Sequence, residues 1–256
     1  MDLHLRGKRV LITGASKGIG AAAEAFAEEG ADVMLAARSA EQLKALADRL
    51  RSAHQIDATA HAVDLRKPED IARLVKDAAD IDILVNNAGD IPGGSIDKID
   101  EATWRHAWEL KVFGYINLTR AVYARMKAQK SGVIVNVLGN AGEKLNAAYI
   151  AGSTANAGLM AFTRTLGGAS PADGIRVLGV SPGPVATDRL LSLYKQMAAA
   201  KLGDANRYEE LFKGMAFDRP ASAEEIAWTV AFAASARSSY TSGIYITVDG
   251  GLAARS

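Results

Sequence analysis

The sequence predicts an α/β protein with a doubly wound parallel sheet, in which helices cover both faces. Short apolar runs rich in β-branched residues recur along the 256 residues, and stretches with helical periodicity separate them. Alternation of this kind produces parallel strands joined by right-handed crossovers. We expect one sheet of seven strands, over residues 9–12, 32–36, 60–63, 81–85, 132–137, 176–180 and 244–248.

The helical stretches fall between these strands, and one of them carries its own start signal. Ser222 is followed three residues later by Glu225, a capping box that indicates a helix N-terminus. The sequence contains no internal repeat, low-complexity tract or linker, so we expect a single domain over residues 1–256. The expected helices lie near residues 19–29, 40–53, 69–79, 102–128, 148–168, 189–213 and 222–235.

Residues 188–218 interrupt the alternation of strands and helices. Long insertions at the ligand end of such sheets often cover a bound ligand, so we expect a substrate lid here. The alternative is a peripheral pair of helices packed on the sheet. Several apolar side chains favour a medium-sized hydrophobic substrate: Tyr194, Met197, Leu211, Phe212, Met215 and Phe217.

The overall composition argues against several classes of function. A net charge of +1 does not suggest a nucleic-acid or anionic-membrane partner. The absence of cysteine excludes disulfides and thiolate chemistry, and the four histidines lack metal-ligand spacing, so we expect no metal. The sequence contains no run of about 18 apolar residues, so we expect no membrane span. The first ten residues lack the apolar core of a signal peptide, so we expect a cytoplasmic protein.

A glycine-rich turn at residues 13–20 connects the first strand to the first helix. Gly14, Gly18 and Gly20 allow backbone N–H groups to approach a pyrophosphate, and the helix N-terminus adds favourable partial charge. Such a turn on its own is also compatible with a simple tight turn. Its position between a strand and a helix favours a phosphate-binding site.

Three further motifs follow in order: Asn-Asn-Ala-Gly at 86–89, Ser-Pro-Gly-Pro-Val-Ala-Thr at 181–187 and Val-Asp-Gly-Gly at 248–251. Together with Thr-Gly-x3-Gly-x-Gly at 13–20, they make the chain resemble the short-chain dehydrogenase/reductase family over essentially its whole length. The resemblance implies a Rossmann-type fold, a nicotinamide dinucleotide cofactor and an oxidoreductase activity.

The resemblance also implies which residues contact the cofactor. The glycine-rich turn would hold the pyrophosphate, Asp64 and Leu65 the adenine, and Asn86 and Ala88 the adenosine ribose. Val185 and Thr187 would hold the nicotinamide carboxamide. The full expected set is Gly14, Ser16, Lys17, Gly18, Ile19, Gly20, Arg38, Asp64, Leu65, Asn86, Ala88, Gly89, Pro182, Gly183, Val185 and Thr187.

The end of the second strand favours NADP(H) over NAD(H). An NAD enzyme places an acidic residue here to accept a hydrogen bond from the ribose 2′-hydroxyl. This chain has Ala37, followed by Arg38, whose guanidinium suits a 2′-phosphate. In the family that the chain resembles, Lys17 would be a second cation near this phosphate. The alternative is that Arg38 is a solvated surface charge.

The resemblance fails at the catalytic residues. Family members usually carry an Asn, a Ser that orients the carbonyl, a Tyr that transfers a proton and a Lys that binds the nicotinamide ribose. Local landmarks place Lys111 at the Asn position, Gly139 at the Ser position, Gly152 at the Tyr position and Asn156 at the Lys position. All four usual residues are therefore absent.

This departure has three interpretations. The protein is a catalytically inactive NADP(H) sensor or scaffold, the register is misplaced, or the site has been rebuilt. Tyr149 and Ser153 have the Tyr-x3 spacing, but no Lys follows, so a shifted register explains little. We favour a rebuilt site because Lys111 and Asn156 look like an exchange of the usual Asn and Lys.

Tyr149 is the candidate proton donor or acceptor in a rebuilt site. It lies one helical turn before Gly152, and the missing side chains at Gly139 and Gly152 leave room for its ring. A charge about 4 Å away at an effective dielectric of about 20 is worth about 4 kcal/mol, or about three pKa units. Lys111 would supply that charge, provided that it points inward. The alternatives are that Lys111 is a surface lysine and that Tyr149 is only a packed aromatic residue at the start of a helix.

The same segment contains further candidates. Asn156 and Asn140 are expected to orient the substrate, with Ser153 as another replacement for the missing serine. Glu143 and Lys144 are interpreted as a solvated loop pair. The six residues between Tyr149 and Asn156 match the Tyr-x6-Lys spacing of related enoyl-thioester reductases. The substrate is therefore a carbonyl or alcohol, or a conjugated enone.

The resemblance also implies an oligomer. Family members usually form tetramers through their two long helices, here 102–128 and 148–168, and their last strand. We expect a homotetramer or a homodimer that acts on a small molecule.

Overall fold

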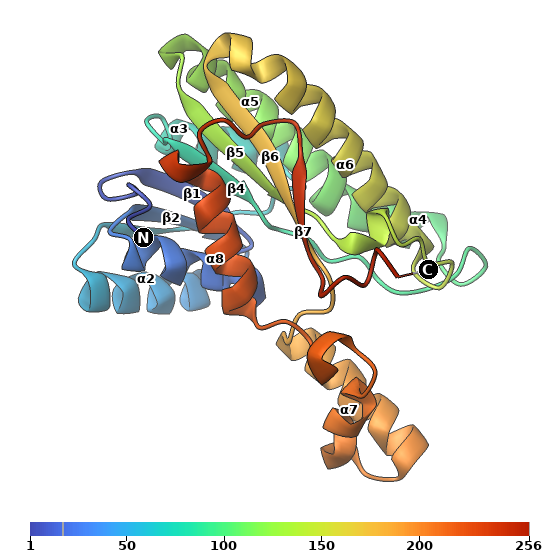
Figure 1. The fold of residues 1–256 in the computed structure, drawn as a ribbon. Helices are drawn as coiled ribbons and strands as arrows, with labels where there is room; N and C mark the ends of the chain where they lie inside the picture. The colour runs from blue at the N-terminus through green and yellow to red at the C-terminus, as the bar shows by residue number, and fades with distance from the viewer. Residues whose placement is uncertain (17, 256) are drawn as a thin grey trace.

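The computed structural model describes residues 1–16 and 18–255 (Figure 1). The predicted cofactor contact of Lys17 lies outside the described residues. Within them, the seven predicted strands form one parallel sheet in the order β3-β2-β1-β4-β5-β6-β7. Every strand lies within two residues of its predicted bounds. The strands are β1 (Arg9–Thr13), β2 (Asp32–Ala37), β3 (Ala58–Ala62), β4 (Ile83–Asn86), β5 (Gly132–Val137), β6 (Ile175–Pro182) and β7 (Tyr245–Val248).

The order of the strands reverses between β1 and β4. β2 and β3 extend from one side of β1, whereas β4 to β7 extend from the other. At such a point the connections leave the sheet in opposite directions, so a crevice opens beyond the carboxyl ends of the strands. The fold therefore places the candidate site there.

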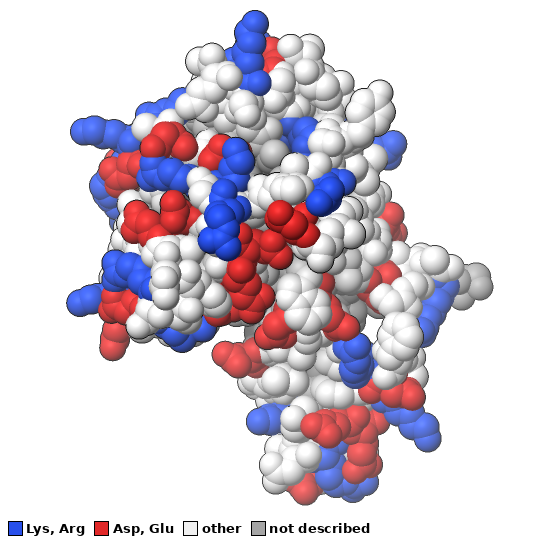
Figure 2. Space-filling view, turned by 60° about the vertical axis from the view of Figure 1, so that its left-hand side comes forward, with Lys and Arg blue, Asp and Glu red and all other residues white. Residues whose placement is uncertain are grey.

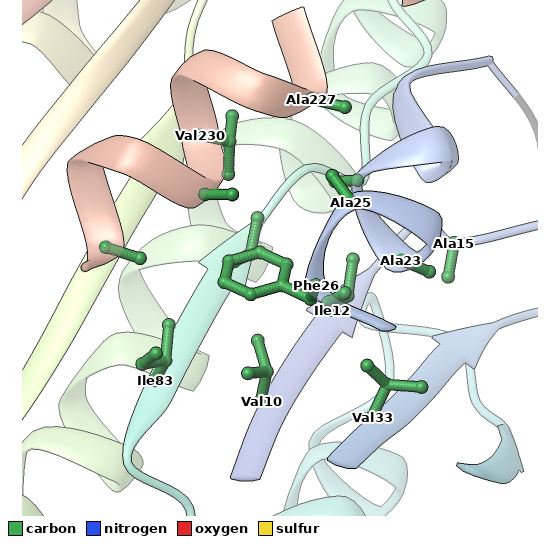
Figure 3. Close-up of a cluster of buried hydrophobic side chains, with 14 of the residues drawn as sticks. Val10, Ile12, Ala15, Ala23, Ala25, Phe26, Val33, Ile83, Ala227 and Val230 are labelled. Atoms are coloured by element: carbon green, nitrogen blue, oxygen red, sulfur yellow. The ribbon is translucent and has the colours of Figure 1, made fainter. Parts of the chain in front are cut away.

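Helices cover both faces of the sheet, as predicted (Figure 1). Side chains alternate along the strands, so Val10 and Ile12 face one core while Leu11 faces the other. Figure 3 shows the first core, where Phe26 of α1 lies beside Val230 of α8. The helices are α1 (Ala22–Glu28), α2 (Ala40–His54), α3 (Pro68–Asp77), α4 (Glu101–Trp108), α5 (Gly114–Gln129), α6 (Ile150–Ala169), α7 (Asp188–Leu202) and α8 (Ala223–Ala234).

α1, α2 and α8 pack on the first core, and α3 and α5 on the second. The predicted capping box of α8 is present, because Ser222 Oγ accepts a hydrogen bond from Glu225 N while the Glu225 carboxylate accepts one from Ser222 N. Positive and negative side chains are interspersed on the face that Figure 2 shows. No described helix combines the length and apolarity that a membrane span needs.

The predicted helix 102–128 is interrupted. α4 and α5 are joined by η2 (Glu109–Phe113), a turn of π-helix. A π-turn shifts the residues that face a neighbouring element, and such turns are frequent at functional sites. Here the turn carries Lys111.

The predicted lid forms a helical hairpin that projects from the body of the molecule (Figure 1). α7 packs against η5 (Ala205–Phe212), a 3-10 segment with a kink at Arg207. Tyr194 and Phe212, two of the side chains that suggested a hydrophobic substrate, pack on each other with their ring centroids 5.0 Å apart. Phe217 is 84% exposed. These side chains are therefore not good indicators of the substrate.

Candidate active site

Two adjoining cavities lie at the carboxyl ends of the central strands. The outer cavity, of about 680 Å³, extends from the glycine-rich turn to Arg38 at the end of β2. The inner cavity, of about 560 Å³, extends from β5 and β6 to α6 and α7. Asn87, Gly89, Asp90 and Thr187 border both. The two cavities therefore share a wall and form one cleft.

The glycine-rich turn is held against the turn after β4. A Cβ atom at Gly14, whose φ is +66°, would lie 2.8 Å from the Cα atom of Ala88, so only glycine fits without a shift of backbone. Thr13 Oγ1 accepts hydrogen bonds from the backbone N atoms of Asn87 (2.9 Å) and Ala88 (3.2 Å). A Cβ atom at Gly18 would lie 3.0 Å from the Thr187 Cγ2 atom. These contacts fasten the glycine-rich turn against other residues that border the cleft.

Most of the expected cofactor residues border the cleft. Arg38 is exposed at the rim of the outer cavity, next to Ala37. Gly14, Ser16, Gly18, Leu65 and Ala88 border the outer cavity. Pro182, Gly183 and Val185 border the inner cavity, and Gly89 and Thr187 border both. Ile19 and Gly20 lie in η1 (Gly18–Ala21), the turn that precedes α1.

Two of the expected cofactor residues, Asp64 and Asn86, do not border either cavity. The Asp64 carboxylate accepts hydrogen bonds from the Arg66 side chain at 2.6–3.1 Å, which lowers the pKa of Asp64; its neighbours Val63 and Leu65 border the cavity instead. Asn86 is fully buried, and its Nδ2 donates to Thr119 Oγ1 and Asn136 Oδ1.

Asn87 takes the place at the cleft that the sequence suggested for Asn86. The reason is the alternation of side chains along a strand. β4 ends at Asn86, whose side chain belongs to the buried face, and the next residue turns toward the cleft.

Lys111 is buried in the wall of the inner cavity, with 8% of its surface exposed. Its Nζ donates to Val137 O at 2.8 Å and to Tyr115 Oη at 3.1 Å. Tyr115 Oη in turn donates to Val137 O at 3.0 Å. Burial lowers the pKa of Lys111 to about 7, because the charged ammonium loses its hydration.

The stem of Lys111 passes over Gly89. A Cβ atom at position 89 would lie 2.7 Å from the Lys111 Cδ and 3.5 Å from its Nζ. Because Gly89 borders both cavities, the amine lies near their junction. The lysine therefore points inward and is not the surface lysine of the alternative interpretation.

Tyr149 precedes the first residue of α6, and its ring fills the space of an absent side chain. A Cβ atom at Gly152 would lie 2.0 Å from the Cε1 and Cζ atoms of the Tyr149 ring. The ring borders the inner cavity. The space beside Gly139, which we also expected the ring to use, is occupied by Asn156, whose Nδ2 would lie 3.2 Å from a Cβ atom there.

The two candidate asparagines also border the inner cavity. Asn156 is 4% exposed, and its Nδ2 donates to Gly152 O at 2.8 Å. Among the described residues, the buried Asn156 Oδ1 has no hydrogen-bond partner. Asn140 Nδ2 donates to Asp249 Oδ2 at 3.3 Å.

The remaining candidates have structural contacts instead. Ser153 Oγ accepts from Asn146 N at 3.0 Å, and so fastens the loop before α6. Glu143 and Lys144 are both exposed, as expected, and the Glu143 carboxylate also accepts from the hydroxyls of Tyr245 and Thr247 at 3.1 and 3.2 Å. Lys144 Nζ donates to Leu252 O. These bonds fix the strand-to-helix segment against the C-terminal part of the chain.

Comparison with known proteins decides the family. The model of the short chain dehydrogenase family matches residues 8–198. The chain belongs to the short-chain dehydrogenase/reductase family. An uncharacterized oxidoreductase of Bacillus subtilis, YvrD, is 31% identical over 98% of both chains. The 3-oxoacyl-[acyl-carrier-protein] reductase FabG of Vibrio cholerae is 32% identical over 98% of this chain and 99% of its own.

Solved structures of short-chain dehydrogenases/reductases match the whole fold. The L-sorbose reductase of Gluconobacter frateurii, complexed with NADPH and L-sorbose, superposes with a TM-score of 0.94 at 32% identity and 100% coverage of both chains. An actinorhodin polyketide ketoreductase with NADPH has a TM-score of 0.91 at 26% identity, covering 97% of this chain and 98% of its own. The seven-stranded Rossmann-type fold and an oxidoreductase family are thus shown.

The contact between Tyr149 and Gly152 leads to a first prediction. Replacing Gly152 by alanine introduces a methyl group where the Tyr149 ring lies. The ring is therefore expected to move, because Gly152 is fixed in the backbone of α6. We expect turnover to fall at least tenfold while the dissociation constant for NADPH changes less than twofold. The measurements are steady-state kinetics and calorimetric titration.

Gly158→Ala is the matched control, because a Cβ atom at Gly158 of the same helix would meet nothing within 4 Å. We expect its turnover to stay within twofold of the wild-type value. If Gly152→Ala were as active as Gly158→Ala, the position of the Tyr149 ring would be irrelevant to the chemistry.

Proposed function

We propose that the protein is an NADP(H)-dependent oxidoreductase with a rebuilt active site, acting on a carbonyl or alcohol, or on a conjugated enone. One observation carries the proposal: Lys111, Tyr149 and Asn156 meet at the inner cavity, which shares a wall with the dinucleotide-sized outer cavity. An amine, a phenol and an amide are thereby assembled beside the expected nicotinamide.

The outer cavity fits the cofactor. Gly14 and Gly18 of the glycine-rich turn border this cavity and bring backbone to its wall without side chains. Ala37 leaves the 2′-position without an acid, and Arg38 offers a guanidinium to a 2′-phosphate. The NADPH complexes of the L-sorbose reductase and the actinorhodin ketoreductase support the same choice. When bound, NADP(H) supplies or accepts the hydride.

Tyr149 handles the proton in this proposal. Its ring occupies the space of a side chain at Gly152, the position that corresponds by sequence to the family's tyrosine. During reduction the Tyr149 hydroxyl donates a proton to the substrate oxygen, and during oxidation the phenolate accepts it. Asn140 and Asn156 orient the substrate.

Lys111 supplies the positive charge that the family usually takes from position 156. Its Nζ lies near the junction of the two cavities, held by Val137 O and Tyr115 Oη. The tyrosine in direct contact with this amine is Tyr115, and a charge that reaches Tyr149 across the inner cavity would favour its phenolate form. The exchange of Lys and Asn between α6 and the π-turn η2 therefore keeps a cation in the wall of the cleft.

A turnover assay tests the proposal. We expect the protein to oxidise NADPH in the presence of at least one ketone, aldehyde or enone from a broad panel, measured as loss of absorbance at the NADPH maximum. Binding of NADPH without turnover on any member would contradict the enzyme and favour a sensor or scaffold. The absence of the usual Asn, Ser, Tyr and Lys is the observation that favours this second candidate.

We further propose a homotetramer or homodimer. Large apolar side chains are exposed on the first of the two long helices, at Phe113, and on α8, at Trp228 and Phe232. A second copy would cover them. The lid role of residues 188–218 is part of the same proposal, supported by Leu190 and Leu193 of α7, which border the inner cavity.

A further inference from the structure

Four asparagines border the inner cavity: Asn87, Asn140, Asn146 and Asn156. An amide side chain offers both a donor and an acceptor, so a cluster of asparagines suits a neutral polar ligand. The apolar lid side chains had suggested a hydrophobic substrate instead. The chemistry of the cavity wall is the better guide, because these amides border the space that the substrate would occupy.

The partners of three of these amides determine which end remains for a ligand. Asn156 Nδ2 bonds to Gly152 O, Asn87 Nδ2 to Gly14 O, and Asn140 Nδ2 to a carboxylate oxygen of Asp249. Carbonyl and carboxylate oxygens only accept, so the amide NH2 must face them in each case. Each amide oxygen remains as an acceptor, and each NH2 keeps one further N–H. A ligand that brings donors would meet the oxygens.

Asn156 is the most informative of the three. Its side chain is 4% exposed, and its Oδ1 is buried without a partner among the described residues. A buried carbonyl oxygen without a hydrogen bond is costly, and native proteins rarely leave one. Asn156 borders the inner cavity, so a ligand hydroxyl that reaches this oxygen would satisfy it.

Lys111 presents the complementary group. As an ammonium, its nitrogen has three N–H donors, and two of them bond to Val137 O and Tyr115 Oη. One N–H donor remains, and Lys111 borders the same cavity as Asn156. As an ammonium it donates one hydrogen bond to a ligand oxygen, such as a carbonyl.

From these two groups we propose that the substrate is a neutral α-hydroxycarbonyl compound or the corresponding vicinal diol. The reacting oxygen lies toward Lys111 and Tyr149, and Asn156 Oδ1 accepts the hydrogen bond of the neighbouring hydroxyl. This assignment rests on the proposed oxidoreductase function and adds the substrate class. Asn156 is then a specificity-determining residue for the hydroxyl next to the reacting carbon.

The test compares two ketones of the same size, hydroxyacetone and 2-butanone, with NADPH. We expect kcat/KM for hydroxyacetone to exceed that for 2-butanone at least tenfold, since a site built to bond a hydroxyl discriminates against its methyl analogue. Asn156→Leu keeps the branched shape but removes the acceptor, together with the donor to Gly152 O, so this ratio should fall about tenfold. The dissociation constant for NADPH should change less than twofold.

Asn206→Leu is the matched control. Asn206 is exposed on η5 and borders neither cavity, so its ratio should equal that of the wild type. Asn156→Ser is a second variant in case the leucine prevents folding; its hydroxyl restores an acceptor, and the ratio should lie between those of the wild type and Asn156→Leu.

Two results would overturn the inference: a wild-type preference for 2-butanone, and an unchanged ratio of the two kcat/KM values in Asn156→Leu. An unchanged ratio together with a weaker NADPH affinity would assign Asn156 to the cofactor ribose.

If neither ketone is reduced, the result counts against the proposed function and not against the substrate class. Saturation-transfer NMR on the NADP+ complex then tests whether each ketone binds. Binding of hydroxyacetone but not 2-butanone would support the inference. Binding of neither, or of both alike, would overturn it.

Discussion

Replacing Tyr149 by phenylalanine is expected to lower kcat by at least tenfold, and by about 100-fold if its hydroxyl is the sole proton donor. The ring itself remains in the space beside Gly152, because phenylalanine has the same shape. Only the hydroxyl is lost, so the dissociation constant for NADPH should stay within twofold. Steady-state kinetics with a ketone that the wild-type protein reduces, together with calorimetric titration of NADPH, provide both measurements.

Tyr123→Phe is the matched control for this variant. Tyr123 Oη donates to Asp173 Oδ2 at 2.7 Å, and the residue borders neither cavity. It also loses one hydroxyl from a tyrosine, yet its kcat should remain within twofold of the wild type. Equal activity of Tyr149→Phe and Tyr123→Phe would remove Tyr149 from the mechanism.

Replacing Lys111 by methionine is expected to lower kcat/KM for ketone reduction at least tenfold near pH 6. The methionine fills a similar volume over Gly89 but carries no charge, so it no longer favours the phenolate of Tyr149. The loss depends on pH, because the pKa of Lys111 is about 7. The wild-type rate should fall as the pH rises through about 7, and the variant should lack this decrease.

The buried Lys111 also makes the free energy of unfolding depend on pH. Its pKa is lowered from 10.5 to about 7 by burial, so between these values the unfolded chain binds more protons than the folded one. The free energy of unfolding therefore rises with pH across this window. At about 1.4 kcal/mol for each pKa unit, the contribution is at most about 5 kcal/mol.

Urea unfolding of the wild type and Lys111→Met at pH 7 and pH 10 isolates this contribution. The variant should be more stable relative to the wild type at pH 7 than at pH 10. An identical pH dependence of the two proteins would mean that Lys111 is not a buried titrating group.

Much of the fold was accessible from the sequence because its signals are local. The alternation of β-branched runs and amphipathic stretches indicated all seven strands, and Ser222 and Glu225 marked the start of α8. The glycine-rich turn was recognisable because Gly14 and Gly18 serve a backbone geometry that other residues do not adopt easily.

The candidate site was only partly accessible, because its geometry depends on contacts distant in sequence. Glu143 bonds to Tyr245 and Thr247, more than 100 residues away, and no local pattern indicates this. The π-turn that carries Lys111 is equally invisible in a helical periodicity that continues through it. The different places of Asn86 and Asn87 were equally inaccessible, because the strand was expected to end at residue 85 and all four residues of β4 are buried.

The most direct test of the account is calorimetric titration of the purified protein with NADPH and NADH. The glycine-rich turn and Arg38 predict binding of NADPH at least tenfold tighter than that of NADH, and Arg38→Ala should remove most of this difference. The absence of binding heat with NADPH at millimolar concentration would contradict the account, because the hydride, the proton donor and the substrate class all depend on that cofactor.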